Sequence, residues 1–140
     1  MIERFLTAQE KSYADALAQI QKGHKQTHWI WYVFPQMQGL GKSETARFYG
    51  IHNRQEAEAY LAHPVLGKRL AEIIEAVLNH RDKTPLQIFG HPDDLKFHSS
   101  MTLFNAVSPA EDQNVFAQAL DLFFAGIKDS NTLTLLDQSK

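Results

Sequence analysis

The stretch from Leu66 to Leu78 constrains the fold more than any other part of the sequence. Its apolar residues recur at spacings of three and four, and charged residues fill other positions. The apolar positions are Leu66, Leu70, Ile73, Ile74, Val77 and Leu78, and the charged ones are Lys68, Arg69, Glu72 and Glu75. This period is that of an α-helix with one face in a core. The rest of the chain must therefore supply elements that cover this face.

Signals for further helices recur along the chain. Helices favour Ser, Thr, Asp or Asn at the N-cap with Glu three residues later, proline at the first position and glycine after the end. These signals predict helices from Thr7 to Gly23, from Ser43 to Tyr49, from Asn53 through Leu61, from Pro64 through the apolar stripe of residues 66–78, from Thr84 to Gly90, from Asp93 or Asp94 to Phe104, from Ser108 to Gly126 and from Asn131 to Asp137. We expect an all-α fold, a compact single domain over residues 1–140 of about six to eight helices with extended loops.

One segment competes for a β-strand. The sequence HWIWYVF, residues 28–34, is dense in aromatic and β-branched residues, and Pro35 biases Phe34 towards an extended backbone. A single strand has no partner, because the sequence offers neither a second comparable run nor an Asn-Gly hairpin. The segment is therefore predicted to form a short buried helix or an irregular part of the core.

Composition narrows the classes of function. The 140 residues carry a net charge of −2 and lack cysteine, so disulfides, thiolate nucleophiles and cysteine-ligated metals are excluded. No basic segment indicates nucleic-acid binding, and no apolar run is long enough for a membrane span. The seven histidines follow no known metal-ligand spacing, and no cofactor is indicated. With charges throughout the amino-terminal segment, no signal peptide is indicated, and we expect a cytoplasmic monomer.

A glycine pair marks the first candidate site. In QGLGKS, Gly39 and Gly41 precede Lys42 and Ser43, but a nucleotide-binding P-loop would require glycine where Gln36 stands. Exposed amide groups before a helix, together with the Lys42 ammonium, favour an anion such as phosphate. The alternative is a tight turn in which Ser43 is an ordinary helix cap and Lys42 points into solvent.

The aromatic block supplies the second candidate. Trp29 and Trp31 lie two residues apart, so they cannot share one helix face with all their aromatic neighbours. A tryptophan lining a pocket could stack on a ring of a ligand, with His28 and Gln36 as hydrogen-bonding partners. The alternative is that the rings form the centre of the core.

The third candidate is DDLKFHSSMTLF, residues 93–104. If this segment is helical, Lys96 shares a face with Ser99 or Ser100, and Asp94 and Lys96 are candidate catalytic groups, with Ser99 beside the ligand. His98 and Ser99 diverge on a helix because they are neighbours in sequence, so they do not form a base and nucleophile pair. The alternative is a structural helix whose small serines allow close packing.

Three motifs in order, HWIWYVFPQMQGLGKS, EAEAYLAHPVLGKRL and DDLKFHSSMTLF, resemble a family of small bacterial proteins catalogued as domain of unknown function 1810. Some of its members carry the label calpastatin. The resemblance implies a mainly helical single domain and no established activity, and the periodic helices argue against a disordered protease inhibitor. Recurring family positions correspond to Trp29, Trp31, Phe34, Pro35, Gln36, Gly39, Gly41, Ser43, Tyr60, His63, Pro64, Leu66, Gly67, Asp94, Lys96, Ser99, Met101, Thr102 and Phe104. Phe97 and His98 depart from the family pattern, which weakens any role for His98.

Two functions remain open at the level of sequence. The first is binding of a small anionic molecule of phosphate or nucleotide type, with the possibility of an enzyme that acts on it. A loose analogy with small helical proteins that act on ADP-ribose-type N-glycosidic compounds would place Asp94 near the anomeric carbon, but fold analogy is weak support for chemistry. The second is a protein-interaction module without catalysis, whose partner the sequence does not name. A pocket that gathers Gln36, Lys42, Asp94 and Lys96 would favour the first.

Overall fold

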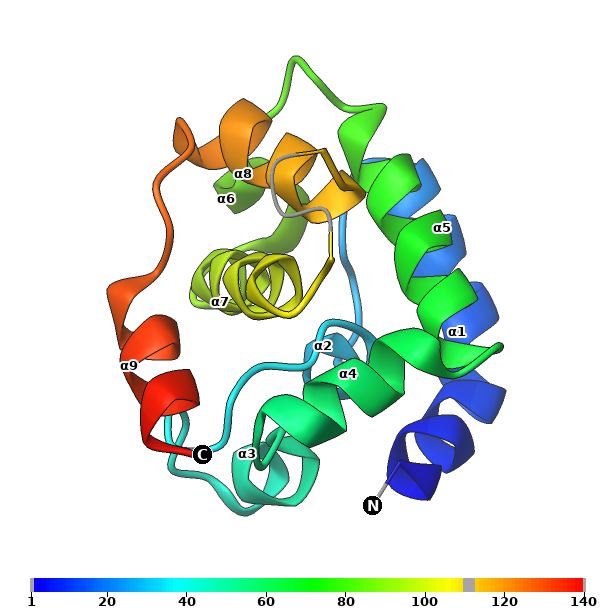
Figure 1. The fold of residues 1–140 in the computed structure, drawn as a ribbon. Coiled ribbons are helices and arrows are strands. Elements are labelled where there is room, and N and C mark those ends of the chain that lie inside the picture. Colours follow the sequence, from blue (N-terminus) through cyan, green and yellow to red (C-terminus); the bar gives the residue numbers. More distant parts are fainter. Residues whose placement is uncertain (1, 110–112, 140) are drawn as a thin grey trace.

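A computed structural model describes residues 2–109 and 113–139. This part of the chain forms nine helices and no strand, which confirms the all-α fold class (Figure 1). The helices are α1 (Glu3–Gln21), α2 (Ile30–Val33), α3 (Glu44–Tyr49), α4 (Arg54–Ala62), α5 (Leu66–Leu78), α6 (Pro85–Phe89), α7 (Asp93–Ala106), α8 (Val115–Phe124) and α9 (Ser130–Gln138). In the described part of the chain, every helix is too short or too polar to span a bilayer.

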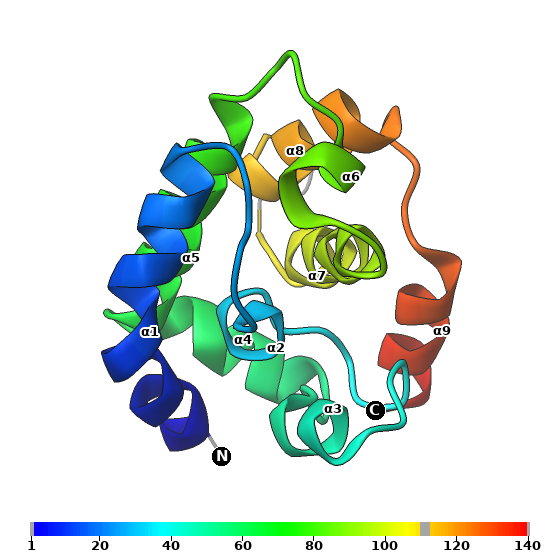
Figure 2. The same cartoon turned by 180° about the vertical axis from the view of Figure 1, so that it is seen from behind.

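Helix α7 lies at the centre of this arrangement. In Figures 1 and 2 it is viewed nearly end-on, with α1 and α5 packed together on one side and α9 on the other. Most of its circumference is buried, including Phe97, Ser100 and the run from Met101 to Asn105. Helix α7 is therefore a core helix, and Ser100 is fully buried in it.

The predicted stripe on α5 faces this core. All six apolar residues of the stripe are buried, whereas Lys68, Glu72 and Glu75 lie on the outer, more exposed side. The predicted caps Ser43, Asn53 and Thr84 each accept a hydrogen bond from a backbone N–H three residues on. Local sequence signals thus place these helix starts correctly.

Several predicted boundaries are wrong. Helix α1 already begins at Glu3, because Phe5 is buried in the core and Arg4 pairs with Glu56 of α4 at 2.8 Å. Helix α7 begins without an Asp cap, since Pro92 occupies the N-cap position and the Asp93 carboxylate pairs with Lys25. The helix predicted from Ser108 begins instead at Val115, capped by Asn114, and part of its predicted first turn, residues 110–112, lies outside the described residues.

The aromatic block turns as a short helix rather than a strand. Helix α2 covers Ile30–Val33, and Ile30, Val33 and Phe34 are buried. Trp29 is 1% exposed, and its Nε1 donates a hydrogen bond of 2.8 Å to Oε1 of Gln19. Trp29 therefore belongs to the core, which is one of the two interpretations of the aromatic block, whereas Trp31 is half-buried.

Candidate functional site

Main-chain hydrogen bonds at Gln36 and Gln38 fix the first part of the loop after α2. The N–H of Ile51 donates to the carbonyl of Gln36, and the N–H of Gln38 donates to the carbonyl of Ile51, both at 2.9 Å. Further along, Gly39 has φ of +105°, which favours glycine, and lies against Leu135 of α9. The loop thus runs from the end of α2 across to α9 (Figures 1 and 2).

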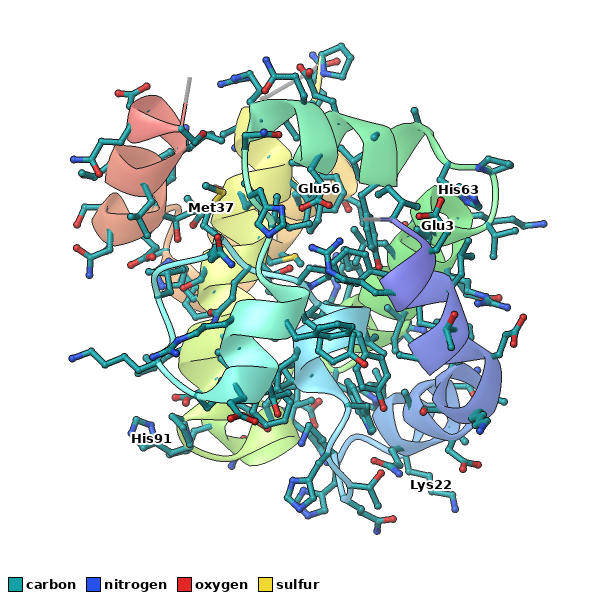
Figure 3. The ribbon with its side chains drawn as sticks, turned by 90° about the horizontal axis from the view of Figure 1, so that it is seen from below. Glu3, Lys22, Met37, Glu56, His63 and His91 are labelled. Atoms are coloured by element: carbon teal, nitrogen blue, oxygen red, sulfur yellow. The ribbon has the colours of Figure 1, made fainter. Side chains whose placement is uncertain are left out.

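A pocket of about 310 Å³ lies where this loop meets α7 and the start of α9. It is lined by Gln36, Leu40, Gly41, Pro92, Leu95, Lys96, His98, Ser99, Asp129 and Asn131. Figure 3 shows Met37, the neighbour of Gln36, beside α7 and on the same side of the molecule as α9. Other surface pockets have similar volumes, from about 310 to 390 Å³, so volume does not single this one out. Its distinguishing feature is the set of polar side chains from three separate segments.

Gln36 is the most unusual of these side chains. The residue is only 7% exposed, yet among the described residues its amide group makes no hydrogen bond. Among the described residues, the enclosed side-chain atoms without a partner are Oγ of Ser100 and Oδ1 of Asn105, so the Gln36 amide reaches solvent in the pocket. Gly41 leaves room beside this amide, since a Cβ there would lie 3.7 Å from Nε2 of Gln36 and only 2.5 Å from Cβ of Ala46. The amide is therefore held in place by its backbone and left open towards the pocket.

Lys96 gives the pocket a positive charge. Its Nζ lies 3.4 Å from Oδ1 of Asp93 and 5.5 Å from the centre of the Trp31 ring. Asp93 is paired more closely with Lys25, whose Nζ lies 2.7 Å from the other carboxylate oxygen. One carboxylate thus faces two ammonium groups, and the three side chains together carry one positive charge in excess. That excess charge is available at the pocket through Lys96.

Ser99 and Asp129 also line the pocket. Oγ of Ser99 donates to Oδ2 of Asp129 at 3.2 Å, and the Asp129 N–H donates to Oγ1 of Thr102 at 2.9 Å. His98 stacks on Phe124 with the ring centres 4.1 Å apart, and its Nε2 lies 2.7 Å from the Ile127 carbonyl oxygen. These contacts attach residues 127–129 to α7. They fix both the start of α9 and the carboxylate at its cap.

The structure brings together only some of the predicted site residues. Gln36, Gly41, Lys96 and Ser99 line the pocket, whereas Lys42 and Asp94 do not. Asp94 instead lies 3.1 Å from Nδ1 of His91. Figure 3 shows that histidine at the edge of the molecule. A catalytic role for Asp94 or Lys96 stays a prediction, and only Lys96 has a place in this pocket.

The remaining predicted residues lie at or beyond its margin. Gly39 turns the loop without lining the pocket, and Ser43 is the cap of α3, accepting from the Ala46 N–H at 3.1 Å. His28 is exposed, and Trp29 belongs to the core. Trp31 reaches the site only indirectly, as the ring beneath the Lys96 ammonium. In residues 2–109 and 113–139, no group of three His, Asp or Glu side chains could hold a metal ion.

Asp129 and Asn131 are pocket residues that the sequence did not predict. Asp129 caps α9, with Thr132 three residues on donating its N–H to Oδ2 at 3.1 Å. Its N-cap spacing is visible in the sequence and would have started the last helix at Ser130 rather than Asn131. Nothing in the sequence places it against Ser99, which lies 30 positions away.

Comparison with known proteins identifies the family. A model of the family described as Protein of unknown function (DUF1810) matches residues 1–136. The chain belongs to the DUF1810 family. A search of solved structures finds this DUF1810 chain similar to the conserved hypothetical protein Rv1873 from Mycobacterium tuberculosis, known from a crystal structure. The two share 41% sequence identity with a TM-score of 0.93, over 97% of this chain and 96% of that one. No curated protein matches this DUF1810 chain.

Proposed function

We propose that the protein binds a small polar molecule with an anionic group in the pocket between the 36–41 loop, α7 and the start of α9. The observation that carries the proposal is Gln36, a buried glutamine that lines the pocket and has no hydrogen-bond partner for its amide among the described residues. A ligand that pairs with this amide would replace the solvent that reaches it in the pocket.

Lys96 and the size of the pocket support an anionic ligand of phosphate or nucleotide type. Lys96 offers a charge that Asp93 does not fully neutralise, because Lys25 lies closer to that carboxylate. A volume of about 310 Å³ lies at the lower end for small-molecule sites and exceeds what a lone phosphate would fill. Leu40, Leu95 and Pro92 add apolar wall, which suits the carbon skeleton of such a molecule.

Two other hypotheses have less support. Anion binding at Lys42 and Ser43 is weakened because Ser43 already caps α3, which is only six residues long, and Lys42 is exposed. The interaction-module hypothesis stays a prediction. Large exposed apolar residues are spread over separate elements: Phe48, Val65, Leu86, Leu95 and Ile127.

Replacing Lys96 should weaken binding, and replacing Lys42 should not. We expect some member of a panel of nucleotides, sugar phosphates and inorganic phosphate to raise the melting temperature of the wild type, because a ligand that binds only the native state stabilises it. Lys96→Met should lower the affinity for that compound at least about tenfold, since a charge-assisted contact is lost. Calorimetric titration measures both affinities.

The matched control is Lys42→Met, which removes an exposed lysine outside the pocket. Its affinity should equal that of the wild type. If no compound in the panel binds, or if Lys42→Met and not Lys96→Met weakens binding, the proposal is wrong.

Substituting Gln36 should separate binding from stability. Gln36→Met keeps the length of the side chain and removes an amide that has no protein partner, so the free energy of unfolding should change by no more than about 1 kcal/mol. The same variant should lose the ligand-induced shift in melting temperature. Urea denaturation and the thermal-shift panel measure the two effects.

Gln19 provides the comparison for that variant. It is also buried, but its Oε1 accepts from two backbone N–H groups and from Trp29, and its amide donates to Thr27. Gln19→Met should therefore destabilise the protein by roughly 2–3 kcal/mol. A similar loss in Gln36→Met would mean that Gln36 has a structural role, against the proposal.

A further inference from the structure

The carboxylate of Asp129 has a second oxygen and a negative charge that its role as a helix cap does not require. All of its hydrogen bonds go to one oxygen, Oδ2, which accepts from Oγ of Ser99 and from both the N–H and the Oγ1 of Thr132. Among the described residues, the second oxygen, Oδ1, accepts no hydrogen bond. A neutral asparagine caps a helix as well as an aspartate does. The free oxygen and the charge are therefore open to another role.

That free oxygen belongs to a residue that lines the proposed binding pocket. An ionised carboxylate only accepts hydrogen bonds, so a ligand group that meets it must donate one. The negative charge of Asp129 would repel a phosphate or carboxylate group of the ligand. That group would bind instead at the Lys96 ammonium. Lys96 and Ser99 lie one turn apart on α7, and Ser99 is bonded to Asp129, so the two opposite charges belong to one small site.

The neighbouring amides decide what kind of donor fits. Gln36 and Asn131 line the same pocket, and each amide presents donors and an acceptor. A ligand ammonium group could only donate, and would leave the N–H groups of these amides unpaired. A hydroxyl group both donates and accepts, so it can satisfy Asp129 and an amide at once.

We propose that the site is specific for hydroxylated anions, such as sugar phosphates, with Lys96 binding the anionic group and Asp129 selecting for the hydroxyls. This inference rests on the proposed function above and adds the class of ligand and the residue that selects it. Asp129 is a specificity-determining residue in this account, with no part in a chemical step.

The test compares three phosphate esters on the full-length wild type and on Asp129→Asn. The esters are ribose 5-phosphate, ethyl phosphate, which has no hydroxyl on its carbon chain, and phosphoethanolamine, which has an ammonium group instead. Asparagine retains the cap, so the variant should fold, and circular dichroism with a melting curve checks that. Calorimetry should show that ribose 5-phosphate binds the wild type at least tenfold more tightly than either of the other esters.

In Asp129→Asn, the affinities for ribose 5-phosphate and ethyl phosphate should move in opposite directions. Ribose 5-phosphate should bind at least about tenfold more weakly because its hydroxyls lose an ionised acceptor. Ethyl phosphate should bind equally or more tightly, because removal of a nearby negative charge favours an anion.

Each other result has a distinct meaning. If ribose 5-phosphate and ethyl phosphate bind the wild type equally, through Lys96 and regardless of Asp129, the inference fails and the proposed function stands. Tighter binding of phosphoethanolamine than of ribose 5-phosphate also overturns the inference, in favour of a zwitterionic ligand. If no ester binds, and no other anion binds in a way that depends on Lys96, the proposed function itself fails.

Discussion

Phe97→Ala should lower the free energy of unfolding by about 4 kcal/mol, a large part of the 5–15 kcal/mol that stabilises a typical domain. Phe97 is fully buried on α7, and its ring centre lies 4.5 Å from that of Phe89 and 5.2 Å from that of Phe34. Rings of Phe123 and Phe124 from α8 complete the cluster. Truncation would leave a cavity bounded by four elements that cannot all collapse into it. Urea denaturation followed by circular dichroism measures the loss.

Leu95→Ala is the matched control for this prediction. Leu95 lies two residues earlier on the same helix and is 54% exposed, so its truncation should change stability by no more than about 0.5 kcal/mol. Losses of similar size in the two variants would show that Phe97 is not the centre of the core. Because α7 also carries Lys96 and Ser99, we expect partial loosening of this cluster to weaken ligand binding.

Gly67→Ala should destabilise the protein by about 3 kcal/mol, although alanine is the better helix former. Gly67 lies in the first turn of α5. A Cβ added there would overlap the main chain of Leu61 in α4. The nearest atom, the Leu61 carbonyl oxygen, would be only 2.2 Å away, and its carbonyl carbon 3.1 Å. A backbone atom cannot rotate aside as a side chain can, so the two helices would have to separate. Thermal and urea denaturation should both report the loss.

Gly90→Ala separates crowding from backbone strain. Gly90 ends α6 with φ of +76°, and a Cβ there would meet nothing within 4 Å. With ψ of 172° this is a conformation that essentially only glycine adopts, so its substitution should cost backbone strain alone, about 1–3 kcal/mol. If Gly67→Ala lowers the free energy of unfolding by less than about 1 kcal/mol, the close α4–α5 packing at Gly67 is wrong.

The candidate site could be predicted only in part. Local patterns single out four residues that line one pocket: Gln36 from the aromatic block, Gly41 from the glycine loop, and Lys96 and Ser99 from a helix face. Lys42 and Asp94 belong to the same local patterns, but their side chains do not line it. Spacing along the chain says which residues are near each other in one element, and it says little about which of them turn towards a third element.

Asp129 is a pocket residue that local sequence patterns do not indicate. Its sequence signal is that of an ordinary helix cap, and only the hydrogen bond from Ser99 and the place of α9 beside the loop bring it to the pocket. The role of Gln36 likewise depends on an absence of partners in three dimensions. A sequence does not record whether a polar side chain has found one.

The sequence by itself determined the helical class, most helix positions and the buried face of α5, because helix periodicity and caps depend on residues within a few positions of one another. It also identified the family. The tertiary structure alone decided that α7 is the central helix, that α1 begins four residues earlier than its local signals indicate, and that Trp29 is core. It also decided which polar groups meet in one pocket, because the contacts responsible join residues that are far apart in the chain and are selected by packing over the whole molecule.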